Sequence, residues 1–326
     1  MTIKAEFTNL NVVGVLKTMK LEARKSAKGS DMIIGNMVVE VEDNVKNVLN
    51  NIRVEVLQMR LTGKEQKENP MYKSMQTVME EYKSIDIDGR AQADTISVVG
   101  SVEINDYQGR DGNMRSNMRF SGRFFNRVEA TTAHKAEFDA KVAVVGYTPV
   151  VDADGLPVEP ETDSVEAYTV GYQNVITPLK GLVIHQDENQ LLTSFKGLYQ
   201  PGSTGQLLVK INNYPDTTEP EEQPEVVQGF GQTIQPRTFT KFINELEIIG
   251  GNMPLEEGLG YTADEIQEIK DLRRKQLAVK SEVSAEPVIT MPTAGFGKPT
   301  PPAKEGVGGV PVTNETAVQN GDLPKF

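Results

Sequence analysis

The sequence contains no cysteine and no tryptophan, and it has only two histidines, His134 and His185. The lack of cysteine excludes disulfide scaffolds, thiolate zinc sites and cysteine nucleophiles. With so few histidines, far apart in the chain, we expect neither a multi-histidine metal site nor a Ser-His-Asp triad. There is no run of 18 apolar residues, and the N-terminus has no apolar signal core. We therefore predict a soluble, cytoplasmic protein.

Signatures of catalysis are also missing. Gly297-Lys298 is followed by Pro299, and Pro292 stands where a phosphate-binding loop needs its first glycine. Two Asp-x-Asp-Gly turns, at residues 86–89 and 152–155, lack the glycine and the glutamate that complete a calcium loop. We predict that the protein is not an enzyme and needs no cofactor and no metal. An enzyme with an unrecognised site is the alternative left open.

Charge is unevenly distributed along the chain. Residues 1–150 hold 21 lysines and arginines against 20 aspartates and glutamates, a net of +1. Residues 151–326 hold 13 against 26, a net of −13, which agrees with −12 for the whole chain. This asymmetry favours separate roles for the two halves. The alternative is that the acidic residues only keep the protein soluble.

Valine- and isoleucine-rich segments dominate the first 214 residues and predict a mainly β protein. In one of them, Ile52, Val54 and Val56 alternate with Arg53 and Glu55, as in a half-buried strand. We predict strands over residues 11–21, 31–41, 51–61, 95–106, 113–128, 137–148, 166–175, 179–185, 206–214 and 240–249. An Asn69-Pro70 start and a Thr262–Glu265 capping box predict helices over residues 71–82 and 262–280.

A weak internal repeat indicates two related units. Asn11-Val12-Val13-Gly14-Val15 resembles Ser97-Val98-Val99-Gly100-Ser101, and similar strands follow each. We predict tandem OB-like β-barrels, then a small α/β C-terminal unit and a disordered tail; chance similarity is the alternative to the repeat. The tail has 7 prolines and 6 glycines in 46 residues, too few apolar groups to form a core. The predicted domains are residues 1–92 and 93–214 for the barrels, 215–228 for an acidic linker, 229–280 for the C-terminal unit and 281–326 for the tail.

The most distinctive segment is residues 113–127, where arginine recurs at every fourth position and no acid occurs. On a strand, odd-numbered positions share one face, which places the arginines beside Phe125 and puts Phe120 and Phe124 in the core. Guanidinium groups contact phosphates and an aromatic ring stacks on a base, so this face suits a single-stranded nucleic acid. The alternative is a solvated sheet face whose arginines pair with acids such as Glu103 and Asp139. The predicted contacts are Arg110, Arg115, Arg119, Arg123, Phe125 and Arg127.

A second basic cluster surrounds the first strand and its turn. Flexible basic loops between barrel strands commonly close over a bound DNA strand. We therefore add this cluster to the predicted nucleic-acid contacts. Its members are Lys17, Lys20, Arg24, Lys25 and Lys28.

With its valine-rich strands, the helix after the third strand and the basic-aromatic strand, the chain resembles bacteriophage-type single-stranded DNA-binding proteins of the OB-fold kind. The resemblance implies a protein that coats and protects single-stranded DNA during replication or recombination. In that family an acidic tip ending in Leu/Ile-Pro-Phe docks replication and repair proteins. Lys325 interrupts that motif here. The docking residues that the resemblance implies are Asp322, Leu323, Pro324 and Phe326.

Two other classes compete with this interpretation. One is a β-rich phage structural or assembly protein without nucleic-acid binding, whose acidic half simply faces solvent. The other is an OB module that binds protein instead of DNA. Only the DNA interpretation requires the acid-free arginine strand.

Overall fold

The computed structural model describes residues 8–27, 29–62, 67–109, 111–171, 175–216, 242–256 and 258–285. Strands dominate these residues, which confirms the prediction of a mainly β protein. Eleven of the strands hydrogen-bond into one sheet. The sheet closes on itself twice, because β6 also pairs with β1 and β9 also pairs with β8.

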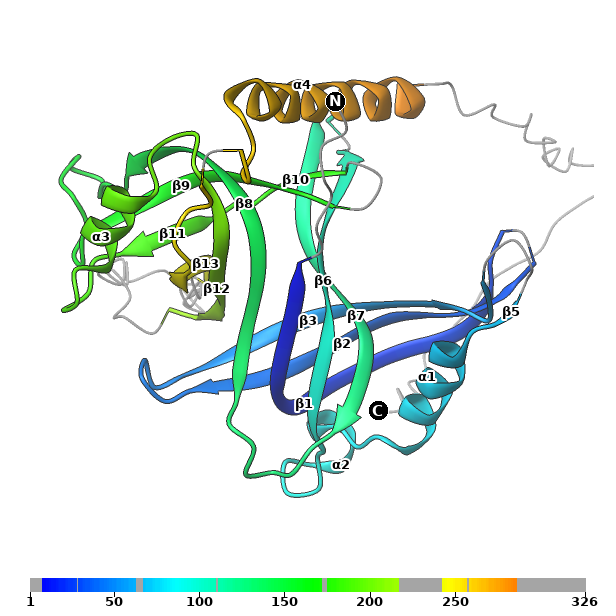
Figure 1. The fold of residues 1–326 in the computed structure, drawn as a ribbon. Coiled ribbons are helices and arrows are strands. Elements are labelled where there is room, and N and C mark those ends of the chain that lie inside the picture. The colour runs from blue at the N-terminus through cyan, green and yellow to red at the C-terminus, as the bar shows by residue number, and fades with distance from the viewer. Residues whose placement is uncertain are drawn as a thin grey trace, which may run out of the picture. The chain divides into compact units, whose positions relative to one another are not determined.

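Five strands form the first closed barrel (Figure 1). The first three strands pair in sequence, the third runs parallel to β7, β7 pairs with β6, and β6 returns to β1. A helix follows the third strand, so the connectivity is that of the five-stranded OB-fold. The strands are β1 (Asn9–Lys25), β2 (Asp31–Asp43), β3 (Val48–Met59), β6 (Thr95–Gln108) and β7 (Met114–Arg127), and the helix is α1 (Pro70–Glu81). Short elements between them are β4 (Leu61–Thr62), β5 (Lys67–Glu68) and α2 (Ile85–Asp88).

The second barrel repeats this connectivity. β8 pairs with β9 and β12, β9 with β11, β11 runs parallel to β13, and β13 pairs with β12. A helix again separates the third strand from the fourth. The prediction of tandem OB-like barrels is therefore confirmed. The elements are β8 (Lys135–Pro149), β9 (Thr162–Val170), β10 (Ile176–Pro178), β11 (Leu182–His185), α3 (Leu191–Leu198), β12 (Thr204–Pro215) and β13 (Phe242–Gly251).

The barrels do not follow the domain boundaries predicted from the sequence. A boundary after residue 92 would separate β6 and β7 from the barrel that they close, and β13 belongs to the second barrel instead of a C-terminal unit. The two segments of the internal repeat lie in β1 and β6, where Val12 is paired with Val98. Their similarity thus reflects two neighbouring strands that line one core, and the strand equivalent to β1 is β8.

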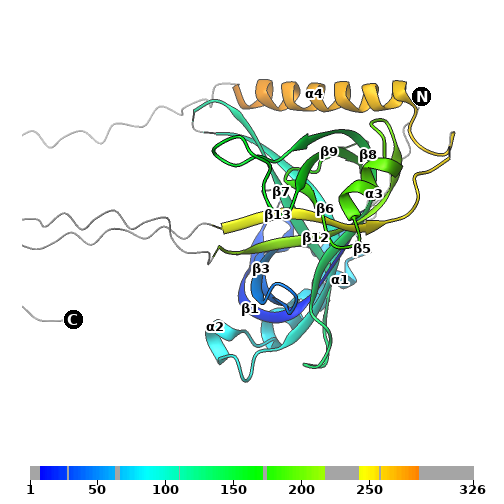
Figure 2. The ribbon, with the colours of Figure 1, turned by 90° about the vertical axis from the view of Figure 1, so that its left-hand side faces the viewer.

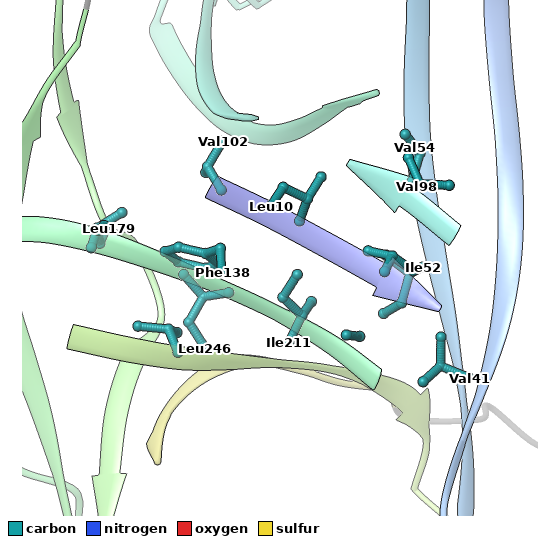
Figure 3. Packing of buried hydrophobic residues seen from close by; sticks show 14 of the residues in the cluster. Leu10, Val41, Ile52, Val54, Val98, Val102, Phe138, Leu179, Ile211 and Leu246 are labelled. Atoms are coloured by element: carbon teal, nitrogen blue, oxygen red, sulfur yellow. The ribbon is translucent and has the colours of Figure 1, made fainter. Parts of the chain in front are cut away.

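One hydrophobic core connects the two barrels. Leu10 of β1 is paired with Phe138 of β8, and both side chains are fully buried. Figure 3 shows this pair among buried residues of both barrels, such as Ile52 and Leu246. Each such side chain contributes about 1.5–3 kcal/mol through burial. The barrels therefore stabilise each other through β1 and β8.

Both predicted helix starts are confirmed. Asn69 is the N-cap of α1, which begins at Pro70. Its side chain accepts a hydrogen bond from the Met71 amide at 3.0 Å. Thr262 and Glu265 form the predicted capping box, with backbone-to-side-chain hydrogen bonds of 2.9 and 3.2 Å. The helix after this box, α4 (Ala263–Ala285), continues five residues beyond its predicted end. It lies over the end of the β6–β7 hairpin in both views (Figure 1, Figure 2).

Several predictions fall outside the described residues. These are the linker beyond residue 216, the tail beyond residue 285, Lys28, Arg110 and the predicted docking residues Asp322, Leu323, Pro324 and Phe326. Among the helices that the structure does describe, none has the length and apolar character needed to cross a membrane.

Candidate nucleic-acid interface

Strand β7 carries the arginine row, but a β-bulge interrupts its alternation. The β6–β7 register pairs Val99 with Phe124 and Gly100 with Gly122, which leaves Arg123 as an extra residue on β7. One extra residue moves every later side chain to the opposite face of the sheet. Phe124 is accordingly 53% exposed and Phe125 only 4% exposed. The prediction that Phe125 faces solvent and Phe124 lies in the core is therefore wrong.

Upstream of the bulge, the predicted faces agree with the structure. Met118 and Phe120 pack against the hydrophobic core, whereas Arg115 and Asn117 are exposed on the other face. A Cβ atom at Gly122 would lie 2.3 Å from the Phe125 ring. Gly122 thus leaves the space into which Phe125 turns, and a glycine inside a strand is a known mark of a bulge.

The outward face of the β6–β7 hairpin, which we call the arginine face, gathers basic, amide and aromatic side chains. Arg115 is paired with Tyr107 and Arg119 with Glu103. The opposite side of the hairpin's far end is covered by α4, because Arg273 binds Asp106 and Ser116 there. The arginine face therefore lies on the side of the hairpin that α4 does not cover. Its residues are Val99, Ser101, Glu103, Asn105 and Tyr107 on β6, and Arg115, Asn117, Arg119, Ser121, Arg123 and Phe124 on β7.

Acidic residues already bind two of these arginines. Arg119 donates to Glu103 at 2.9 and 3.2 Å and lies 3.6 Å from Glu55. Arg115 forms an ion pair with Asp111 at 3.1 Å. Pairing with Glu103 is what the solvated-face alternative predicts. Asp139, the other acid that this alternative names as an arginine partner, accepts hydrogen bonds from Asn9 and Gln206.

These contacts also favour the charged form of Asp111. Hydrogen bonds from the Asn113 side chain and from Arg115 lower the pKa of the Asp111 carboxyl group, which is already ionised at neutral pH. Any phosphate that binds Arg115 must therefore compete with this carboxylate. The same competition applies to Glu103 at Arg119.

The other two predicted arginines of β7 have different surroundings. The Arg123 guanidinium donates to the Ser101 hydroxyl at 3.3 Å and stays on the arginine face. Arg127 comes after the bulge and leaves that face. It binds Asp94 at 3.1 Å and lies over the Tyr82 ring at 4.5 Å. The Tyr82 hydroxyl donates to the Phe125 carbonyl, and burial raises the pKa of this tyrosine. Arg127 thus helps to hold the end of α1 against β7.

The basic cluster of β1 lies on residues 17–25, the part of the strand that pairs with β2, so β2 and β3 stand between this cluster and β7 on that side of the barrel. Lys17 donates to Asn51 at 2.8 Å, Arg24 lies 3.4 Å from Glu22, and Lys25 lies 2.7 Å from Asp31. Lys20 is exposed on the outward side of β1. The structure therefore separates the two predicted basic clusters into different patches.

Two aromatic residues of the arginine face were missed by sequence reasoning. Phe124 was assigned to the core, and Tyr107 was not considered. The Asn117 side chain donates to the Tyr107 hydroxyl at 3.2 Å, which positions the ring beside the row. The glycines paired across the hairpin, Gly100 and Gly122, were the available signal for the bulge that exposes Phe124.

Comparisons with known proteins give a family and a distant structural likeness. No curated protein sequence matches the chain. The wild-type single-stranded DNA-binding protein of Thermus aquaticus has a TM-score of 0.42 and 10% identity, over 80% of this chain and 99% of that chain. A deletion mutant of the same protein has a TM-score of 0.41 and 13% identity, over 77% and 95%. The model of the YorF family matches residues 7–283. The chain therefore belongs to the YorF family.

Proposed function

We propose that this protein binds single-stranded DNA, without sequence preference, on the arginine face of its first barrel. The observation that carries the proposal is that Arg115, Arg119, Arg123 and the exposed rings of Phe124 and Tyr107 share one outward side of an OB barrel. Arginines that contact the phosphates along the DNA backbone and aromatic rings that stack on bases are the two components of such binding. Coating and protecting single strands during replication or recombination, within the cytoplasm of a cell or of a phage host, is the role we infer.

The dimensions of the arginine face suit a short single strand. Arg115 and Phe124 are nine residues apart on β7, which corresponds to about 30 Å of extended strand. OB-folds bind about 4–16 nucleotides each. A bound strand would follow β7, with phosphates at the arginines and bases on the rings. The proposal is for a binding protein and not an enzyme, and docking of replication proteins by the chain end stays a prediction.

The first test removes the charge of Glu103, the acid that binds Arg119. We expect Glu103→Gln to tighten binding of a fluorescent oligothymidine by up to about fivefold, because the Glu103 carboxylate, whose exposed ion pair with Arg119 contributes about 0.2–1 kcal/mol, no longer competes with phosphate. Arg119→Ala should weaken the same binding. Fluorescence anisotropy titrations against single-stranded DNA, duplex DNA and RNA measure both effects.

A matched control separates a local effect from a general change of charge. Glu188 is exposed in a loop of the second barrel, and Glu188→Gln changes the net charge by the same amount. It should leave the oligothymidine affinity unchanged. An equal increase in affinity for both glutamine variants would contradict binding at the arginine face.

The second test is the dependence of binding on salt. Each phosphate contact on a single strand contributes about −0.7 to the slope of log affinity against log salt, so three arginines predict roughly −2. Arg123→Ala should make the slope shallower by about 0.7. Titrations at several sodium chloride concentrations give these slopes, and a flat response would show that the arginines do not contact phosphate.

A second candidate function has its own supporting observation. The pairs Arg119–Glu103 and Arg115–Asp111 are what a solvated sheet face in a β-rich structural or assembly protein would show. That candidate predicts no oligothymidine binding for the parent protein and no gain for Glu103→Gln. The anisotropy titrations therefore distinguish the two functions directly.

A further inference from the structure

A histidine and two glutamates converge on the second barrel, outside the proposed DNA interface. His185 ends β11, and Glu245 and Glu247 lie on β13, the parallel neighbour of β11. One ligand atom from each lies within 4.8 Å of the others, and His185 Nε2 is 3.4 Å from Glu245 Oε1. Their side chains are only 23%, 22% and 17% exposed. Imidazole nitrogen and carboxylate oxygen are ligands of Zn²⁺.

We propose that His185, Glu245 and Glu247 form a binding site for a divalent transition-metal ion, with Zn²⁺ as the best match. Three protein ligands with a remaining open position is a common arrangement for this ion. At ligand distances of 2.0–2.1 Å, tetrahedral donors lie roughly 3.3 Å apart. The ligand atoms would therefore have to converge by at most about 1.5 Å, and His185 Nε2 and Glu245 Oε1 are already 3.4 Å apart.

The neighbours of the three ligands provide the hydrogen bonds that a metal site needs. Thr162 Oγ1 lies 2.7 Å from His185 Nδ1, so Nε2 is the nitrogen that faces the glutamates. The Asn212 side chain is fully buried and donates to Glu245 at 3.1 Å and to Glu247 at 2.7 Å. Hydrogen bonds of this kind orient the ligands of metal ions. They arise here from β9 and β12, the strands beside β11 and β13.

Asn212 is a positioning residue of the proposed site, because its amide nitrogen donates to both glutamates and its Oδ1 atom, which has no hydrogen-bond partner among the described residues, lies at the other end of the amide group. The donor set is therefore one imidazole nitrogen and two carboxylates.

The Lys46 ammonium group is paired with both glutamates of the proposed site. Lys46 lies in the turn between β2 and β3 of the first barrel, and its Nζ is 2.7 Å from Glu247 and 3.9 Å from Glu245. A metal ion would compete with this ammonium group for the same carboxylate oxygens. Metal binding would therefore release Lys46 from β13 and remove one of the ionic contacts between the barrels.

The test is titration of the full-length, chelator-treated protein with ZnCl₂ by calorimetry and with CoCl₂ by visible absorption. We expect one ion per chain, loss of binding in His185→Ala and at least tenfold weaker binding in Glu247→Gln. Lys46→Met should bind several-fold more tightly, because the competing cation is gone. Thermal unfolding of each variant without metal shows that it is folded.

The chain contains a matched control. His134 is its other histidine, and cysteine is absent. The His134 ring accepts a hydrogen bond from the Glu42 amide at 3.2 Å, so His134→Ala removes one imidazole without touching the cluster. This variant should bind both metals like the parent. Binding that survives His185→Ala, or no binding by either the parent or Lys46→Met, would overturn the proposal.

Discussion

Replacement of Phe124 by alanine is expected to weaken single-stranded DNA binding by about 1–3 kcal/mol, the usual contribution of one stacked base. The ring is more than half exposed on the arginine face, beside Val99 and next to Arg123. Because the ring is exposed, the free energy of unfolding should change by less than about 1 kcal/mol. Anisotropy with an oligothymidine measures the first quantity, and denaturant unfolding measures the second.

The neighbouring ring is the internal control for this result. Phe125 belongs to the hydrophobic core, and its removal should lower the free energy of unfolding by about 3–5 kcal/mol through lost burial and a cavity. Below its unfolding transition, the Phe125→Ala protein should still bind the oligonucleotide. The opposite pattern, an unstable Phe124 variant and a stable Phe125 variant, would mean that the bulge at Arg123 is absent.

Loss of Asp106 should destabilise the protein by about 3–5 kcal/mol, because it leaves a buried arginine without its counter-charge. Asp106 and Arg273 are only 2% and 6% exposed, and two hydrogen bonds of 2.6 and 2.8 Å join them. The pair fastens α4 to the β6–β7 hairpin. Denaturant unfolding of Asp106→Ala measures the loss, and hydrogen exchange of the α4 amides shows whether the helix detaches first.

Two variants sharpen this second prediction. Arg274 is the next residue along α4, is largely exposed and pairs only locally with Asp271 among the described residues, so Arg274→Ala should change stability by less than about 0.5 kcal/mol. The double variant Asp106→Leu with Arg273→Met removes both charges together. It should be near neutral or stabilising, as replacement of buried ion pairs by apolar groups often is. A double variant as unstable as Asp106→Ala would show that the charge is not the cause.

Interactions between residues close in the chain could be predicted from the sequence. The Asn69 cap, the Thr262–Glu265 capping box and the alternation of β3 were all identified correctly. Each depends on residues at most a few positions apart, so local residue pattern is sufficient. The OB-like class followed from the order of these elements, and the arginine row was located because a strand alternates with period two.

The strands that close each barrel and the side chains that share a face depend on contacts between distant parts of the chain. β1 and β6 join residues such as Val12 and Val98 through hydrogen bonds that no local pattern encodes. The bulge at Arg123 lies next to the pair of Gly100 and Gly122, which come from two different strands, and it reversed the roles predicted for Phe124 and Phe125.

The same reason explains the acids on the arginine face and the metal-ligand cluster. Glu103 reaches Arg119 from another strand, and His185 meets Glu245 across 60 positions. Local patterns were enough to predict the β class, the main strands of the first barrel, two of the helices and the basic strand, because these depend on propensity, capping and alternation. Helix α3 was not predicted. The pairing of distant strands determined the binding face and its partners, because contacts across a sheet depend on register, and a single extra residue changes the register.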